Sequence, residues 1–367
     1  MTTGLEEVVV AETRLSGIDG QHGRLLIGGL AVAELADSKT FAEVCALLWG
    51  RKDVPRLDAE LRDGRQRAFE RLADWAGALA LPDAMDAIRG CVAQLPSDTS
   101  AAGLTAAIAV ATAAWSRRAR GLSPLAPDLS ASHAADYLRM IRGEPAGDAE
   151  ARALETYWAT VVDHGLNAST FAARVVASTQ SDRVSAIVAA IGALKGRLHG
   201  GAPGPVLDMF DAIEREGDAE AWLRRHLAAG HRIMGMGHRV YRVRDPRAAV
   251  LEAALERLRQ DGAPTGRLAL ARQVEQVAER LLAQHKPGRR LRANVEFYTA
   301  TLLETLGLPR ELFTPTFAAS RVVGWCAHVA EQQRSGRLLR PRARYVGPAA
   351  GLVSPYSPSQ QRSPVDP

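Results

Sequence analysis

Three of the nine histidines in this sequence stand among residues that favour a chemical role. His199 lies in Gly196-Arg-Leu-His199-Gly-Gly-Ala202, and His238 lies in Gly235-Met-Gly-His238-Arg-Val-Tyr. His164 directly follows Asp163 at the expected end of a helix. Glycine lets a backbone approach a ligand closely and exposes N–H groups, so a histidine in such a loop is placed to act as a neutral donor or as an acid.

A histidine in average surroundings is more often structural than catalytic. We interpret the remaining ones in that way: His22, His133, His226, His231, His285 and His328.

The basic residues are almost all arginines, because only four of the 46 are lysines, and the net charge is +5. A GC-rich genome explains most of this excess. Five arginines nevertheless gather in Arg232–Arg247 beside a single acid, Asp245, and five more in Gln332–Arg344 with no acid. Neither stretch is interleaved with the aromatic residues of a nucleic-acid surface. Arginine forks suit carboxylates and phosphates, so small anionic ligands are expected.

Simple catalytic and nucleotide motifs do not account for these residues. Gly235-Met-Gly237 lacks the third glycine and the preceding strand of a dinucleotide fingerprint, and Gly192-Ala-Leu-Lys-Gly196 has the wrong spacing for a phosphate loop. His328-Val-Ala-Glu331 is not a metalloprotease helix, and no Gly-x-Ser-x-Gly elbow occurs.

Composition indicates a globular protein of about two domains. The chain has 367 residues, of which 47% are apolar and 24% charged. Three distant cysteines, Cys45, Cys91 and Cys326, support neither a disulfide framework nor a zinc site and favour a reducing, cytoplasmic location. Met1–Glu7 has no signal-peptide pattern. Ala101–Trp115, the most apolar stretch, is shorter than the ~20 residues of a membrane span and predicts a buried helix.

The periodicity of apolar residues predicts an all-α protein with one β hairpin near the start. The hairpin is expected within Val8–Ile27, with Val8–Val10 and Arg24–Ile27 as strands around the Asp19-Gly20 turn. After Gly347 the Pro-, Ser- and Gln-rich tail is expected to be disordered. Helices are expected at 40–49, 57–81, from 147–148 through 158, 167–178, 184–194, 246–258, 266–284, 297–306 and 315–331.

Several ordered motifs resemble the citrate synthase family. The signature is Gly235-Met-Gly-His238-Arg-Val-Tyr-Arg242-Val-Arg-Asp245-Pro-Arg247. Family motifs also match Asp163-His-Gly-Leu-Asn-Ala-Ser169, Leu198-His-Gly-Gly-Ala202, Asn294-Val-Glu-Phe-Tyr298, Phe317-Ala-Ala-Ser-Arg321-Val-Val-Gly and Arg340-Pro-Arg-Ala. The resemblance extends from about Gly4 to Pro348.

The resemblance implies a condensation of acetyl-CoA with oxaloacetate followed by thioester hydrolysis. A methyl proton beside a thioester is weakly acidic, so a carboxylate base must act together with a donor to the enolate oxygen. By resemblance, His199 is that donor, His238 polarises the oxaloacetate carbonyl, and Glu296 is the base.

The remaining roles also follow from the resemblance. The binding residues for oxaloacetate are His164, Arg247, Arg321 and Arg340. Arg340 would reach the site of the other subunit of a homodimer. Coenzyme A, as an acyl thioester and not a bound cofactor, would meet Arg242 and the loop with Gly235 and Gly237. No metal, nucleic acid or membrane is implied.

The resemblance further implies two helical domains. The large one would comprise residues 1–199 and 304–348, the small one 200–303, with a cleft between them and a disordered tail at 349–367. Closure of the cleft on oxaloacetate would exclude water and protect the thioester.

One departure concerns the base, because the family usually has aspartate where this chain has Glu296. Glutamate has similar acidity, but a misplacement of ~1 Å can cost about 100-fold in rate. Three alternatives therefore stay open beside a citrate synthase. They are a 2-methylcitrate synthase that uses propionyl-CoA, a catalytically quiet protein that binds oxaloacetate or CoA, and an enzyme that runs the reaction backwards.

Overall fold

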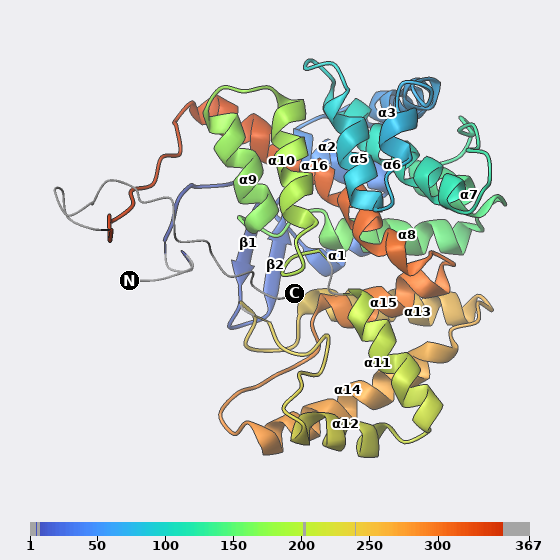
Figure 1. Cartoon of the computed structure of the whole chain (residues 1–367), viewed down its shortest axis with the longest axis vertical. Helices are drawn as coiled ribbons and strands as arrows, with labels where there is room; N and C mark the ends of the chain where they lie inside the picture. The colour runs from blue at the N-terminus through green and yellow to red at the C-terminus, as the bar shows by residue number, and fades with distance from the viewer. Residues whose placement is uncertain (1–4, 6–7, 201–202, 239, 348–367) are drawn as a thin grey trace, which may run out of the picture.

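The computed structural model describes residue 5 and residues 8–200, 203–238 and 240–347, so the expected tail at 349–367 lies outside the described residues. Most of the described chain is helical, which confirms the all-α prediction (Figure 1). The helices of the first half are α1 Val32–Ser38, α2 Phe41–Trp49, α3 Val54–Glu70, α4 Ala76–Leu79, α5 Ala84–Ala93, α6 Ala101–Ala119, α7 His133–Arg142 and α8 Asp148–Val161. Those that follow are α9 Ala168–Ser178, α10 Arg183–Leu194, α11 Pro203–Glu216, α12 Ala219–Ala228, α13 Pro246–Gln260, α14 Gly266–His285, α15 Val295–Thr305, the 3₁₀ turn η1 Arg310–Leu312 and α16 Phe313–Ser335.

A small antiparallel sheet near the N-terminus corrects the predicted hairpin. Its strands are β1 Ser16–Asp19, β2 Arg24–Ile27 and β3 Leu30–Ala31, and Asp19 pairs with Arg24 across the turn. The prediction of β2 is confirmed, but Val8–Val10 is not a strand. The Asp19 carboxylate accepts the backbone N–H groups of Gln21 and His22, which fixes a turn so short that only the residues directly before it can pair with β2.

Helix starts agree well with the sequence, because side-chain caps are local. Thr40 and Glu43 form a reciprocal capping box at α2. Asn167, Asp182 and Asp245 cap α9, α10 and α13 through their side-chain oxygens.

The single helix predicted over Leu57–Leu81 is wrong. It divides into α3 and the short α4, with turns from Arg71 to Trp75. The indole of Trp75, at the end of these turns, is fully buried. Burial of so large a side chain stabilises the folded chain in this conformation.

Two helices organise the core. Every residue of α6 from Leu104 to Ser116 is buried, which confirms the buried helix expected there. Helix α16 packs on α6, α8, α9 and α10. Among the described residues, no helix is both long and apolar enough to cross a membrane.

Helices α11 to α15 gather at one end of the molecule, below the larger group formed by α1–α10 and α16 (Figure 1). Helix α13 joins the two groups, because it packs on α1 and α8 as well as on α15. The loops that carry the predicted site residues lie at this junction. The exact domain limits of 200 and 303 stay a prediction.

Candidate active site

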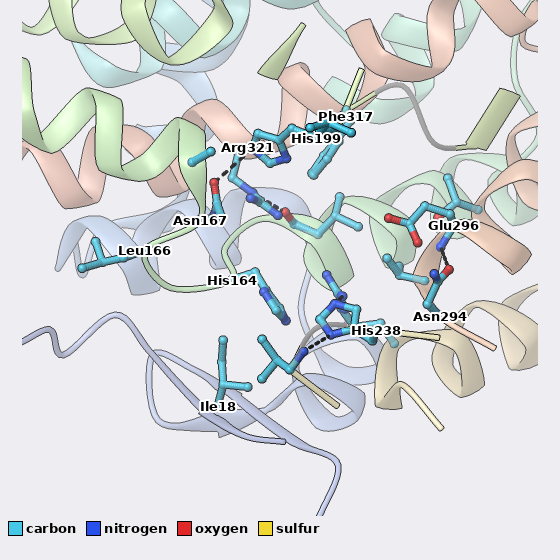
Figure 2. A pocket seen from close by; sticks show the side chains of 18 of the residues that line it. Ile18, His164, Leu166, Asn167, His199, His238, Asn294, Glu296, Phe317 and Arg321 are labelled. Atoms are coloured by element: carbon cyan, nitrogen blue, oxygen red, sulfur yellow. Dashed lines mark hydrogen bonds between the residues drawn. The ribbon is translucent and has the colours of Figure 1, made fainter. Parts of the chain in front are cut away.

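One pocket of about 490 Å³ brings together six of the residues singled out in the sequence. They are His164, His199, His238, Arg247, Glu296 and Arg321. His164 comes from the α8–α9 loop, His199 from the α10–α11 loop and His238 from the α12–α13 loop, and Figure 2 shows them around a common space. Arg247, Glu296 and Arg321 lie on α13, α15 and α16 and line the same pocket.

The ring of His238 is held so that it can donate a proton into the pocket. Its Nδ1 accepts the backbone N–H groups of Val240 and Tyr241 at 3.0 and 3.1 Å. An acceptor nitrogen carries no proton, so the proton of the neutral ring is on Nε2. Arg247 Nη2 lies 3.4 Å from this Nε2, beyond the usual length of a hydrogen bond. Burial and the charge of Arg247 lower the pKa of His238 to about 4. His238 is therefore a neutral Nε2–H donor near pH 7.

His199 sits against a polar cluster on α9. Its Nε2 lies 2.8 Å from Ser169 Oγ and 3.2 Å from Asn167 Oδ1. Ser169 Oγ also accepts the indole N–H of Trp325 at 3.2 Å. The single proton of the Ser169 hydroxyl has two acceptors within reach, Asn167 Oδ1 at 2.7 Å and His199 Nε2. When it is donated to Nε2, the ring carries its own proton on Nδ1. Burial, with a smaller effect of Arg321, lowers the pKa of His199 to about 4, so this ring is also neutral near pH 7.

His164 is packed against the loop of His238. Its Nε2 lies 3.1 Å from the hydroxyl of Tyr241, and the rings of His164 and His238 meet edge to face at 5.6 Å. Burial, together with Arg247 and Arg321, holds the pKa of His164 well below its usual value. The three histidines are thus uncharged, which leaves the positive charge of the pocket to the arginines.

The two arginines differ in how their charge is balanced. Arg247, at the start of α13, forms a buried two-pronged pair with Asp245 through Nε at 3.0 Å and Nη2 at 2.8 Å. Arg321, on α16, is 1% exposed, donates Nε to the Val161 carbonyl, and has no carboxylate within ion-pair distance among the described residues.

The unpaired charge of Arg321 indicates a site for an anion. Burial, with a smaller effect of Arg247, lowers the pKa of Arg321 to about 10, so the guanidinium is still charged near pH 7. A buried charge without a partner is costly. A ligand carboxylate in the pocket would supply the missing partner.

Glu296 brings a carboxylate to the same space from the first turn of α15. Its backbone N–H is capped by Asn294 Oδ1 at 3.1 Å, while its Oε2 is buried without a hydrogen-bond partner among the described residues. Burial raises the pKa of this carboxyl, an effect that the charge of Arg247 opposes. An unpartnered carboxylate of raised pKa has the properties of a general base.

The loop with Gly235 and Gly237 is held by the strand-like segment before α15. Gly237 N–H donates to the Arg292 carbonyl at 2.7 Å, and Asn294 N–H donates to the Gly235 carbonyl at 2.9 Å. Both glycines have positive φ, and a Cβ on Gly235 would lie 2.9 Å from the Phe297 ring. These glycines therefore let the His238 loop lie directly on the Glu296 segment.

Comparison with known proteins agrees with this constellation. The family model "Citrate synthase, C-terminal domain" matches residues 4–342. The chain belongs to the citrate synthase family. It is an enzyme of the citrate synthase type.

Relatives in this family cover nearly the whole chain. The citrate synthase of Haloferax volcanii is 38% identical over 94% of this chain and 95% of the relative. The 2-methylcitrate synthase of Mycobacterium tuberculosis is also 38% identical, over 94% of this chain and 90% of the relative. The crystal structure of citrate synthase from Thermotoga maritima superposes with a TM-score of 0.84 at 33% identity and covers 99% of both chains. A ternary complex of the Thermoplasma acidophilum citrate synthase with carboxymethyl coenzyme A and oxaloacetate has a TM-score of 0.85 at 29% identity, over 97% of this chain and 98% of that one.

Three of the predicted site residues, Arg340, Arg242 and Gly235, do not line this pocket, whereas Gly237 does. Arg340 is exposed on the extended segment that follows α16. Arg242 lines a neighbouring cavity, together with Arg289 and Arg290 from the loop after α14. Within one chain, the pocket therefore contains two of the three arginines predicted to bind oxaloacetate, Arg247 and Arg321, but not Arg340.

Sequence reasoning missed the basic loop after α14. Lys286, Arg289 and Arg290 line cavities that adjoin His238 and Arg242. The run Lys286-Pro-Gly-Arg-Arg290 is a visible sign in the sequence of a turn that carries cations. Its position beside Arg242 follows from the fold.

Two polar residues that contact His199 were also missed as participants; Asn167 lines the pocket and Ser169 is buried behind it. Asn167 and Ser169 belong to the motif after His164 and hold His199, as described above. Tyr157, on α8, lines the pocket and has no hydrogen bond among the described residues. No group of three or more His, Cys, Asp or Glu side chains that could hold a metal occurs in the described part of the chain.

Proposed function

We propose that this protein condenses acetyl-CoA with oxaloacetate and hydrolyses the product thioester to citrate and CoA. One observation carries the proposal. A single pocket combines neutral histidines, an unpartnered carboxylate and a buried arginine that has no anion of its own. The proposed reaction uses all three kinds of group. A buried carboxylate or arginine without a partner lowers the stability of the fold, so its presence favours a functional role.

Oxaloacetate would bind through its two carboxylates. Arg321 offers a buried guanidinium whose Nη groups are free of carboxylate partners in the described chain, and Arg247 is fixed in orientation by Asp245. His164 would contact the same substrate between them. In this arrangement the carbonyl of oxaloacetate faces the Nε2–H of His238.

The proton transfers follow from the protonation states of the site. Glu296 would take a proton from the methyl group of acetyl-CoA while His199 donates a hydrogen bond to the thioester oxygen, which becomes the enolate oxygen. The enolate carbon then attacks the oxaloacetate carbonyl, and the oxygen of that carbonyl takes the proton of His238 Nε2. The new carbon–carbon bond gives citryl-CoA, and the proton held by Glu296 replaces the one that His238 gave.

Hydrolysis completes the reaction. Water attacks the citryl thioester, the carbon–sulfur bond breaks, and CoA leaves as the thiol. Acetyl-CoA, oxaloacetate and one water thus give citrate, CoA and a proton.

CoA would extend from the pocket across the basic loop after α14. Arg242, Arg289 and Arg290 surround one cavity beside His238, and their cations suit the phosphates of CoA. This arrangement supports Arg242 as one of several phosphate contacts. Gly235 and Gly237 act in this proposal mainly by shaping the loop, because Gly237 N–H and the Gly235 carbonyl are already paired with the backbone.

The larger organisation completes the proposal. The segment 200–303 forms a small domain that closes on oxaloacetate, and the protein works as a homodimer in which Arg340 reaches the partner's pocket. The exposure of Arg340 outside its own pocket supports this role. A cytoplasmic location stays a prediction from the cysteines.

A thiol-release assay tests the proposed function. The protein receives oxaloacetate with acetyl-CoA or with propionyl-CoA, and Glu296→Gln is measured beside it. Release that requires oxaloacetate and falls at least about 1,000-fold in Glu296→Gln would support a glutamate base. Absence of release, with oxaloacetate bound in calorimetry, would instead support a quiet binding protein.

The same assay decides between citrate and 2-methylcitrate. The similarity to a 2-methylcitrate synthase, at the same identity as to a citrate synthase, makes propionyl-CoA the second candidate substrate. One methylene in an apolar pocket is worth about 1–3 kcal/mol, so the ratio of the two kcat/KM values identifies the preferred acyl group.

A further inference from the structure

A buried chain of polar side chains runs from the pocket to the C-terminal segment. His328, on α16, lies 3.1 Å through Nε2 from Asp163 Oδ1 and 3.0 Å through Nδ1 from Arg174 Nη1. Both His328 and Asp163 have 0% exposure, and Arg174 has 2%. An arginine can only donate, so Nδ1 is an acceptor and Nε2–H donates to Asp163. The direction of the chain is therefore fixed.

The pocket end of this chain is Asp163, the residue before His164. Although burial raises the pKa of Asp163, the contact with His328 and the charge of Arg321 bring it below its usual value. A charged Asp163 in turn favours the charge on Arg321. Asp163 thus contacts His328 directly and acts on the buried arginine through its charge.

The other end reaches the segment that carries Arg340. Arg174 Nε donates to Gln332 Oε1 at 2.9 Å, and Gln332 Nε2 donates to the Arg337 carbonyl at 2.9 Å. Two residues further, Leu339 N–H donates to Ser178 Oγ at 3.0 Å. The backbone on the N-terminal side of Arg340 is thereby attached to α9 and α16.

We infer that His328 is a positioning residue which, through Asp163 and Arg174, sets the His164 loop and the Arg340 segment for oxaloacetate. This inference rests on the proposed function. Neither His328 nor Arg174 lines the pocket, so both act through other residues. A general loss of packing would weaken every activity, whereas misplacement of these two elements should weaken oxaloacetate binding above all.

The test compares two substitutions at His328 with a matched control. His328→Leu removes both contacts, and His328→Gln keeps an acceptor for Arg174 and a donor for Asp163. The control is His133→Leu, because His133 is also buried and also meets an arginine, with Nδ1 3.2 Å from Arg65 Nη1, but does not line the pocket.

We expect His328→Leu to raise the KM for oxaloacetate about tenfold, which corresponds to ~1.4 kcal/mol of binding. The kcat and the KM for acetyl-CoA should stay within about twofold, and His328→Gln should recover most of the loss. His133→Leu should lower the melting temperature without this change in KM. An unchanged KM in His328→Leu, with a lowered melting temperature, would overturn the positioning role.

A second variant applies if His328→Leu does not fold. Gln332→Met leaves His328 in place but removes the acceptor for Arg174 Nε and the donor to the Arg337 carbonyl. It should raise the KM for oxaloacetate about threefold, because the Arg340 segment loses one anchor. An unchanged KM there would overturn the proposed link to the C-terminal segment. If the unmodified protein neither binds nor turns over oxaloacetate, the proposed function itself fails, and this inference fails with it.

Discussion

Glu296 carries the reactive carboxylate of the site, and its protonation should control the rate on the acid side. Burial raises its pKa above the ordinary 4.5, and a base must be ionised, so activity is lost as the pH falls through that raised pKa. His199 and His238, with pKa values of about 4, stay neutral over the same range. We predict that kcat/KM declines on the acid side with a midpoint above 4.5.

The decline is measured by loss of thioester absorbance, which needs no thiol reagent. The residual rate of Glu296→Gln should lack this dependence. A midpoint at or below that of a free carboxyl would contradict the role of Glu296 as a buried base.

The same carboxylate should reduce stability at neutral and higher pH. A pKa raised in the folded state means that the folded protein holds this proton more strongly, so the cost is present above the folded pKa and disappears below the unfolded one. We predict that Glu296→Gln melts at a higher temperature than the unmodified protein at about pH 8, with the gain lost at about pH 4. Calorimetry or circular dichroism measures both. A lower melting temperature of the variant at the higher pH would contradict the prediction.

Residues that cap the helices also position the site, and among the caps described above Asp245 makes the most contacts with site residues. It caps α13, pairs with Arg247 and accepts the Val295 N–H at the start of α15. Asp245→Ala leaves a buried arginine unpaired, so we predict a loss of about 3–5 kcal/mol of unfolding free energy. Asp182→Ala, at the start of α10, loses the cap and an exposed bond from the Ser185 hydroxyl but no ion pair, and should cost about 1 kcal/mol.

Urea unfolding of the two variants checks this difference. Equal losses would mean that Asp245 is only a cap. A larger loss in Asp245→Ala, together with a raised KM for oxaloacetate, would agree with its contact to Arg247.

The close approach of the His238 loop to α15 depends on Gly235. A Cβ there would lie 2.9 Å from the ring and 3.2 Å from Cα of Phe297, next to Glu296, and the backbone has φ of +72°. We predict that Gly235→Ala lowers kcat/KM by more than about tenfold, because a shift of ~1 Å at the base costs that much or more.

A matched glycine separates the clash from the backbone conformation. Gly230 has φ of +79° with nothing within 4 Å of the added Cβ. Gly230→Ala should therefore cost only roughly 1 kcal/mol of stability and leave kcat/KM unchanged. Similar kinetics in the two variants would show that the contact with Phe297 has no influence on the site.

The assembly decides whether Arg340 contributes to catalysis. If it acts in the partner's pocket, Glu296→Gln and Arg340→Ala are each inactive but complement each other when dissociated and reassociated together. Random mixing makes half of the dimers mixed, each with one intact site, so we predict recovery of about a quarter of the unmodified activity. No recovery, with mixed dimers verified by mass, would place Arg340 outside the partner's site.

Much of the fold could be predicted because its determinants are local. The caps at Thr40, Asn167, Asp182 and Asp245 are visible as residue types, and each begins the helix that was expected after it. The errors arose where a distant partner decides. Val8–Val10 has strand-forming residues but pairs with no strand in the described part of the chain. The helix predicted from Leu57 gives way to turns that end at the buried Trp75.

The family, the all-α class and the six side chains that meet in the pocket could be predicted from the sequence, because motif order and side-chain type are properties of the chain alone. The chemical states of these side chains depend on the fold. The two N–H groups on His238 Nδ1 assign its proton, and the absence of a carboxylate within ion-pair distance of Arg321 in the described chain leaves its charge for a ligand. The fold also brings Arg242 to the same cavity as Arg289 and Arg290, which are far from it in the sequence. Protonation and charge balance depend on burial and on neighbours that only folding brings within a few ångströms.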